Sequence, residues 1–129
     1  MKIALASPPF PKSITDALYW VEKLIKEAAA EKAEIICFPE SYIPGYPWPE
    51  YTVEKASPEK LKAALDSVSR LAKEHSICVV IPMDWYHEGQ ALNIAHVISS
   101  NGKVLGYQAK NQLDPSEDTT WIPGTGRVL

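Results

Sequence analysis

Hydrophobic residues in the first third of the chain recur with two periods, one typical of strands and one typical of helices. Residues 2–6 and 34–38 are short apolar runs that proline soon follows, and we expect a strand in each. Between them, apolar residues at spacings of four and three predict an amphipathic helix that ends near Lys32. Ser13 is the expected N-cap, and Asp16 stands three residues later in a capping-box position. The stripe residues are Ile14, Leu18, Val21, Ile25 and Ala28.

A second helix and a third strand follow. Residues 57–59 read Ser-Pro-Glu, which combines a cap, a proline in the first helical position and an acid in the first turn. Apolar spacing then predicts a helix to about His75. Residues 77–81 form the next apolar run, and we expect Pro82 to end that strand because proline cannot donate to a central ladder.

The last part of the chain predicts an antiparallel pair of strands. Residues 92–98 are apolar on both alternating faces, apart from Asn93 and His96. Asn-Gly at 101–102 is a strong sign of a type I′ hairpin turn, and residues 104–107 form the returning strand. The predicted order, β-α-β-α-β followed by a β-hairpin, is that of an α/β domain whose parallel strands carry packed helices.

The composition suits one domain and excludes several classes of protein. The chain has 129 residues, of which 46% are hydrophobic, and this is enough for a core. Its net charge of −3 comes from mixed signs, so no basic surface for nucleic acid or an anionic membrane is expected. The apolar run at the N-terminus is too short for a signal peptide, and no segment approaches the roughly 20 apolar residues of a membrane span. Cys37 and Cys78 lie in apolar runs without metal-type spacing, which suits a reducing, cytoplasmic environment.

Three charged residues are candidates for chemistry. Glu40 comes directly after a predicted strand, where ligands of open α/β sheets bind, and an aromatic, proline-rich loop follows it. A carboxylate shielded in this way would have a raised pKa and act as a base, although a solvated turn or capping acid has the same position in the sequence. Lys110 follows the returning strand and would hold an oxyanion, or else be a solvated lysine. Glu117, seven residues later, would orient Lys110, bind substrate, or lie on the surface.

Other types of site have little support in the sequence. His75, His87 and His96 form no i,i+4 pair and have no cysteine partner, so a metal site is not expected. The glycines never form a strand–GxGxxG–helix unit, so a dinucleotide site is not expected either.

Two motifs resemble those of one enzyme family. The stretch "CFPESYIPGYPW", which contains Glu40, resembles the glutamate motif of the nitrilase, or carbon–nitrogen hydrolase, superfamily, and its nitrilase-like branch in particular. The stretch "YQAKNQLDPSEDTTWIPGTGR" resembles the lysine motif of that superfamily, with Lys110 and Glu117 in the family's order. Asn93 also stands where such proteins often carry an asparagine, so the resemblance extends along the whole chain.

The resemblance implies an αββα sandwich and hydrolysis of a nitrile or a small amide by a cysteine thiolate. Glu40 would be the general base, Lys110 would stabilise the tetrahedral intermediate, and Glu117 would support the substrate or the lysine. Tyr46 and Trp48 would form walls of the substrate pocket. The chemistry of the family needs no cofactor and no metal.

This chain departs from the family pattern at the nucleophile. The family's cysteine lies beyond the lysine motif, and Cys37 and Cys78 are expected to be inert core thiols. We therefore expect residues 1–129 to be a single partial domain that lacks the C-terminal half and is inactive alone. Residues 128–129 look like the start of another strand, so an unpaired sheet edge is expected to drive self-association. Two alternatives stay open: a non-enzymatic α/β module that associates with itself or a partner, and a split enzyme whose second chain supplies the cysteine.

Overall fold

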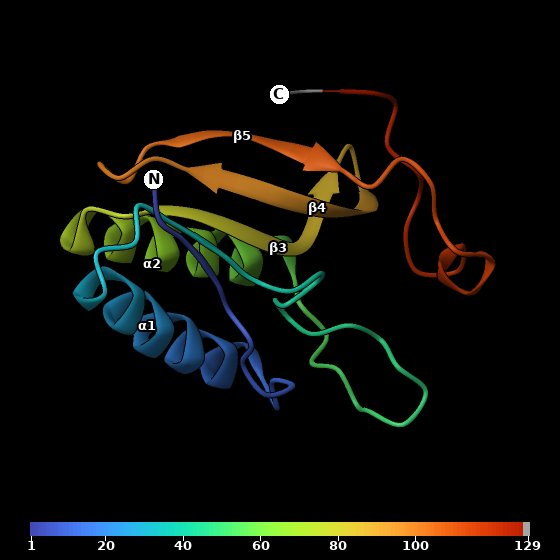
Figure 1. Ribbon diagram of the computed structural model, residues 1–129. Coiled ribbons are helices and arrows are strands. Elements are labelled where there is room, and N and C mark those ends of the chain that lie inside the picture. The colour runs from blue at the N-terminus through green and yellow to red at the C-terminus, as the bar shows by residue number, and fades with distance from the viewer. Residues whose placement is uncertain (128–129) are drawn as a thin grey trace.

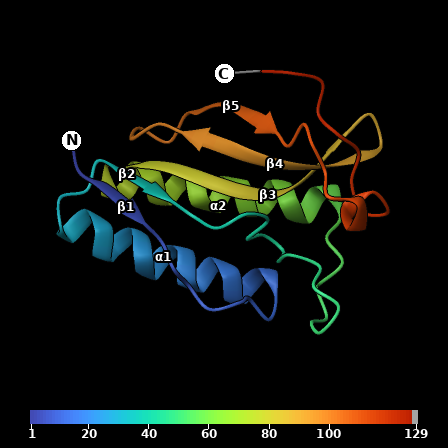
Figure 2. The ribbon, with the colours of Figure 1, turned by 45° about the vertical axis from the view of Figure 1, so that its right-hand side comes forward.

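The computed structural model describes residues 1–127, which form a five-stranded sheet with two helices on one of its faces (Figures 1 and 2). The elements are β1 Ile3–Leu5, α1 Ile14–Ala30, β2 Ile35–Cys37, α2 Pro58–His75, β3 Cys78–His87, β4 Gln90–Ile98, β5 Val104–Ala109 and the 3₁₀ helix η1 Pro115–Glu117. The strands stand in the order β1-β2-β3-β4-β5; β1 to β3 are parallel, and β4 and β5 pair antiparallel. This confirms the predicted order of α/β elements. One layer of helices packs on one sheet, which is half of an αββα sandwich. The strand predicted at 128–129 lies outside the described residues.

Both helices begin where their caps predict. The hydroxyl of Ser13 accepts a hydrogen bond from the Asp16 N–H at 3.0 Å, and the hydroxyl of Ser57 accepts one from the Lys60 N–H at 3.3 Å. These bonds satisfy amide groups that the first turn of a helix leaves without partners. α1 ends at Ala30, slightly earlier than predicted, and Lys32 beyond it has a left-handed φ of 60°.

The prediction that Pro82 ends the third strand is wrong, because β3 continues through it to His87. The Pro82 carbonyl accepts a hydrogen bond from the Ile43 N–H at 3.4 Å, on the side of β3 away from β4. The N–H and C=O of one strand residue point to the same side, so the donor that proline lacks would also point away from β4. β2 has already ended at Cys37, and the strand therefore loses no ladder bond at Pro82.

The hairpin between β4 and β5 is confirmed, but its predicted type I′ turn is wrong. Only Gly102 has a positive φ, 81°, whereas a type I′ turn needs two such residues. The turn packs on α2, and a Cβ on Gly102 would lie 2.7 Å from the Ser69 carbonyl oxygen. The pattern of a type I′ turn occurs instead between β3 and β4, where Glu88 and Gly89 have φ of 51° and 77°.

Side chains on the central strands alternate between two faces with different burial. Ile36, Val79 and Ile81 belong to the core that the helix stripes also enter, and each is at most 1% exposed. Their neighbours along the strands face away from this core and are only half-buried, and we call this surface the open face. Its side chains are Ile35, Cys37, Cys78, Val80, Pro82, Ala95 and Val97.

We expect the chain to self-associate at tens of micromolar, because the side chains named for the open face are apolar. Val80→Lys places a charge near the middle of this face and is expected to shift the protein towards monomer. Tyr19, which is 59% exposed on α1, provides the control, and Tyr19→Lys should leave the assembly unchanged. Light scattering measures the molar mass of each variant. A wild-type monomer at these concentrations would contradict the prediction.

Candidate functional site

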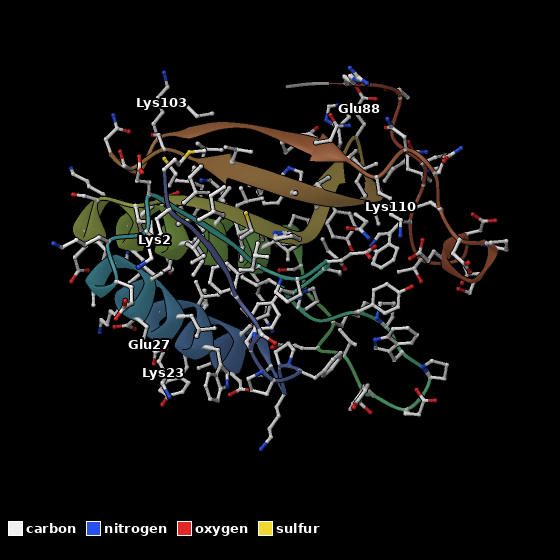
Figure 3. All side chains as sticks on the ribbon, viewed as in Figure 1. Lys2, Lys23, Glu27, Glu88, Lys103 and Lys110 are labelled. Atoms are coloured by element: carbon white, nitrogen blue, oxygen red, sulfur yellow. The ribbon has the colours of Figure 1, made fainter. Side chains whose placement is uncertain are left out.

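The candidate residues come from segments far apart in the sequence that meet at one end of the sheet. Glu40 follows β2, Lys110 follows β5, and Glu117 closes η1. The Lys110 N–H donates to the Asn93 carbonyl at 2.8 Å and thereby extends the pairing of β4 and β5 by one residue. Figure 3 shows Lys110 at the end of β5, on the side of the molecule where the C-terminal segment turns away from the sheet. The structure therefore brings together the three charged residues that the sequence predicts.

Lys110 lies between the two glutamates. Its Nζ is 2.7 Å from Oε1 of Glu40 and 2.9 Å from Oε1 of Glu117. Oε1 of Glu40 also accepts a hydrogen bond from the side-chain amide of Asn93 at 2.8 Å. The Glu40 side chain is 48% exposed, whereas that of Glu117 is 3% exposed. The two carboxylates therefore share one ammonium group but differ in their access to solvent.

Glu117 is a buried acid whose oxygens are all satisfied. Oε1 accepts from the Tyr46 hydroxyl at 2.7 Å and from Lys110, and Oε2 accepts from the Asp114 N–H at 2.8 Å. The last contact belongs to a capping box, because the Asp114 side chain caps η1 in return. Burial alone would raise the pKa of Glu117, but donation from Tyr46, Lys110 and Asp114 outweighs it and lowers the pKa below its usual value.

The same contacts determine the protonation of the neighbouring groups. Hydrogen bonds to Glu40 and Glu117 raise the pKa of Lys110, so its ammonium stays charged at neutral pH. The hydrogen bond to Glu117 raises the pKa of Tyr46 to about 12, with burial adding to the effect. The site therefore holds a permanent cation and a neutral phenol beside two carboxylates.

Glu40 and Lys110 both line two hollows. One has a volume of about 470 Å³, and Tyr46 and Trp48 line it together with Pro39, Asp114, Ser116 and Glu117. The ring centroids of Tyr46 and Trp48 are 4.7 Å apart, and the Trp48 side chain is exposed. The other hollow, of about 400 Å³, lies against β4 and β5, and Pro82, Asn93, Ala95 and Gln108 are among its lining residues. Tyr46 and Trp48 thus line the same hollow as Glu40, Lys110 and Glu117.

The cysteines differ from their predicted burial. Cys37 and Cys78 are half-buried on the open face and not in the core. Burial still raises the pKa of Cys37, which disfavours the thiolate. Within residues 1–127, the hydrogen-bond partners of Glu40 are Asn93 and Lys110, and no thiol is among them.

Sequence reasoning missed Asp84 and Trp121. Asp84 lies in β3, and its Oδ1 accepts hydrogen bonds from the Ser41 hydroxyl at 3.0 Å and the Trp121 indole N–H at 3.1 Å. Burial raises the pKa of Asp84 to about 6, although both donors counteract it. An acid between a methionine and a tryptophan in an apolar strand was the available signal.

Two further findings concern metal binding and membrane spans. In the part of the chain that the structure describes, no three His, Cys, Asp or Glu side chains gather as they would around a metal ion. Neither α1 nor α2 is long and apolar enough to cross a membrane.

Comparison with known proteins gives consistent matches. A family model described as carbon-nitrogen hydrolase matches residues 2–128. The cyanide hydratase of Armillaria gallica is 30% identical over 120 residues, and a nitrilase of Bacillus sp. (strain OxB-1) is 29% identical over 121 residues. The structure of an amidase from Nesterenkonia sp. superposes with a TM-score of 0.85 at 25% sequence identity.

The matched regions cover most of this chain but only part of its relatives. The match to the cyanide hydratase covers 83% of this chain and 33% of that protein, and the match to the nitrilase covers 83% and 35%. The amidase match covers 98% of this chain and 49% of the amidase chain. The chain thus spans about a third of the length of these curated relatives and about half of the solved amidase, whose fold it shares over that half.

Proposed function

The chain belongs to the carbon–nitrogen hydrolase family, and we propose that it contributes the glutamate–lysine part of a site that hydrolyses a nitrile or a small amide. The observation that carries this proposal is the position of Lys110, whose Nζ contacts both Glu40 and Glu117 at one end of the sheet. In this proposal, residues 1–129 are one partial domain of the family.

The hydrogen bonds of Glu40 support the role of a general base. Its Oε1 accepts from Asn93 and Lys110, whereas its Oε2 accepts no hydrogen bond from any residue in 1–127. Oε2 therefore has a lone pair available for the proton of an attacking thiol, and the side chain is 48% exposed, so a thiol can reach it.

The contacts of Lys110 support the role of an oxyanion stabiliser. An ammonium group has three donors, and Glu40 and Glu117 occupy two of them. The third donor is available to the negative oxygen or nitrogen that develops when a thiolate adds to an amide or a nitrile. Glu117 holds the ammonium in place, and Tyr46 and Trp48 form the aromatic wall for the substrate.

The nucleophile of the proposed reaction comes from residues outside these 129. Cys37 is half-buried with a raised pKa, and within the described part of the chain neither Cys37 nor Cys78 forms a hydrogen bond with Glu40. Structures of variants of the related amidase from Nesterenkonia sp. show covalent addition at the active-site cysteine of that enzyme. A corresponding cysteine from another segment or a separate chain would complete the Glu–Lys–Cys set.

The open face supports a second candidate function, in which the chain is a module that associates without turnover. An apolar sheet surface needs cover, and a second copy or a complementing half would provide it. The two candidates differ in whether any assembly of the chain releases ammonia.

We expect this chain alone to release no ammonia from nitriles or amides, because no thiol forms a hydrogen bond with Glu40 in residues 1–127. A mixture with a separate chain that carries the second half of a related amidase, cysteine included, is expected to release it. Glu40→Gln in the mixture should abolish the release while leaving the two chains associated, because glutamine cannot accept the thiol proton.

Two outcomes would contradict this proposal. Turnover by the chain alone that disappears in Cys37→Ala or Cys78→Ala would show that one of these thiols is the nucleophile. A mixture that assembles but releases no ammonia would favour the module without turnover.

A further inference from the structure

Asp84 connects three segments of the chain around the site. Its Oδ1 accepts from the Ser41 hydroxyl at 3.0 Å and from the Trp121 indole N–H at 3.1 Å. Ser41 directly follows Glu40, and Trp121 follows Glu117 by four residues. One carboxylate oxygen on β3 therefore contacts both of the segments that carry the glutamates of the site.

Ser41 is the point at which the chain turns after Glu40. It is fully buried and has a left-handed φ of 47°, a conformation that costs energy for a residue with a side chain. Two contacts with Asp84 hold the turn in place: the side-chain hydrogen bond to Ser41, and a backbone hydrogen bond from the Asp84 N–H to the Ile43 carbonyl at 2.9 Å. The direction in which Glu40 leaves β2 therefore depends on Asp84.

Trp121 continues the connection towards Glu117. Its side chain is 3% exposed, and its ring centroid lies 5.8 Å from that of Tyr46. The Tyr46 hydroxyl in turn donates to Glu117 at 2.7 Å. Asp84 orients the indole, the indole supports the phenol, and the phenol holds the buried carboxylate that binds Lys110.

We propose that Asp84 is a positioning residue that sets the places of Glu40 and Glu117 on either side of Lys110, through Ser41 and through Trp121. It does not itself touch the reacting atoms. Only the catalytic meaning of the placement rests on the proposed function, because the contacts exist whether or not the site turns over substrate.

Both donors point at the same oxygen of Asp84, and this gives the proposal a conservative test. Asparagine has a carbonyl oxygen at the position of Oδ1, so Asp84→Asn keeps an acceptor for Ser41 and Trp121. Asp84→Ala removes the acceptor altogether.

The readout is the ¹³C carboxyl signal of Glu40 and of Glu117 in the full chain, followed by NMR as the pH is varied. In the wild type the pKa of Glu117 lies below its usual value. In Asp84→Ala we expect the pKa of Glu117 to rise and the Glu40 signal to shift by more than its linewidth. In Asp84→Asn both signals are expected to stay close to wild type.

A matched control separates positioning from stability. Val68 is fully buried in α2, and Val68→Ala should lower the melting temperature without moving either carboxyl signal. If Asp84→Ala lowers the melting temperature but leaves both carboxyl signals as in the wild type, Asp84 has a structural role only and the proposal is wrong.

A second variant keeps the test decisive if Asp84→Ala does not fold. Trp121→Phe supplies a smaller aromatic ring without the indole N–H, so the pKa of Glu117 is again expected to rise. An unchanged pKa in this variant would overturn the link from Asp84 to Glu117. A failure of the ammonia assay would leave these signals unaffected, so the two proposals fail independently.

Discussion

Replacing Lys110 with methionine is expected to lower the free energy of unfolding by about 3 kcal/mol at pH 7. Methionine has a similar length but no charge, so the variant leaves Glu117 ionised at 3% exposure without its cation. The Tyr46 hydroxyl and the Asp114 N–H remain as donors, and Lys110 itself is 31% exposed. For both reasons we expect the low end of the range for breaking a buried ion pair.

The expected loss depends on pH in a defined direction. Because the folded-state pKa of Glu117 lies below the ordinary value of 4.5, its ion pair contributes stability above that pH, and the contribution disappears as the pH falls through the folded-state pKa. The wild type and Lys110→Met should therefore differ most near neutral pH and converge in acid. Urea unfolding of both proteins at several pH values measures the difference.

Two comparisons make this expectation specific. Lys62 pairs with Asp66 on the surface of α2, where both side chains are more than 60% exposed, and Lys62→Met should cost no more than about 0.5 kcal/mol. The double variant Lys110→Met, Glu117→Gln should cost less than the sum of its single variants, because it leaves no unpaired buried charge. Equal costs for Lys110→Met and Lys62→Met would show that the Lys110–Glu117 pair adds no stability.

Local signals in the sequence predicted the elements of the fold well wherever a cap or a period specified them. Ser13 and Ser57 cap their helices as predicted, and the apolar stripes are buried apart from Leu18, which is half-buried. The errors occurred where tertiary packing decided the outcome. Pro82 stays within a strand because its neighbour on one side has ended, and Gly102 serves a turn that packs on α2. Neither the end of β2 beside Pro82 nor the packing of Gly102 on α2 can be predicted from the few residues around these positions.

For the site, too, local motifs were predicted and long-range contacts were missed. The motifs that contain Glu40, Lys110 and Glu117 predicted that these residues meet. In the structure, the Lys110 ammonium group donates a hydrogen bond to each of the two glutamates. Asp84 was missed because its role depends on contacts with residues 43 positions before it and 37 positions after it. Alternation along a single strand shows which face a side chain takes, and it does not show which distant loop covers that face.

His96 is expected to make the fold sensitive to acid. Its side chain is 3% exposed and lies between the rings of Trp85 and Tyr107, at centroid distances of 4.6 Å and 5.6 Å. Burial lowers the pKa of His96 from 6.5 to about 4, although the nearby backbone of Gly106 partly counteracts it. Neither ring nitrogen has a hydrogen-bond partner within residues 1–127, so the Gly106 backbone compensates only in part for burying an added proton.

The sign of the effect follows from the order of the two pKa values. Between pH 6.5 and about 4 the unfolded chain binds a proton at His96 and the folded chain does not, so stability falls as the pH falls across this window. The difference of pKa values corresponds to about 3 kcal/mol at the acid end. Asp84, with a pKa raised to about 6, acts in the opposite direction over part of the same range. The contribution of His96 must therefore be measured as a difference between variants.

His96→Leu is expected to remove this sensitivity, because leucine has a similar volume and takes up no proton. Its free energy of unfolding relative to the wild type should rise by about 3 kcal/mol as the pH falls from 7 to 4, and chemical unfolding at each pH measures it. The contribution of Asp84 is present in both proteins and cancels in this difference. His87, whose side chain is 63% exposed, supplies the control, and His87→Leu should follow the pH dependence of the wild type. If His96→Leu loses stability in acid as steeply as the wild type, the acid sensitivity arises elsewhere and His96 is protonated without penalty in the folded state.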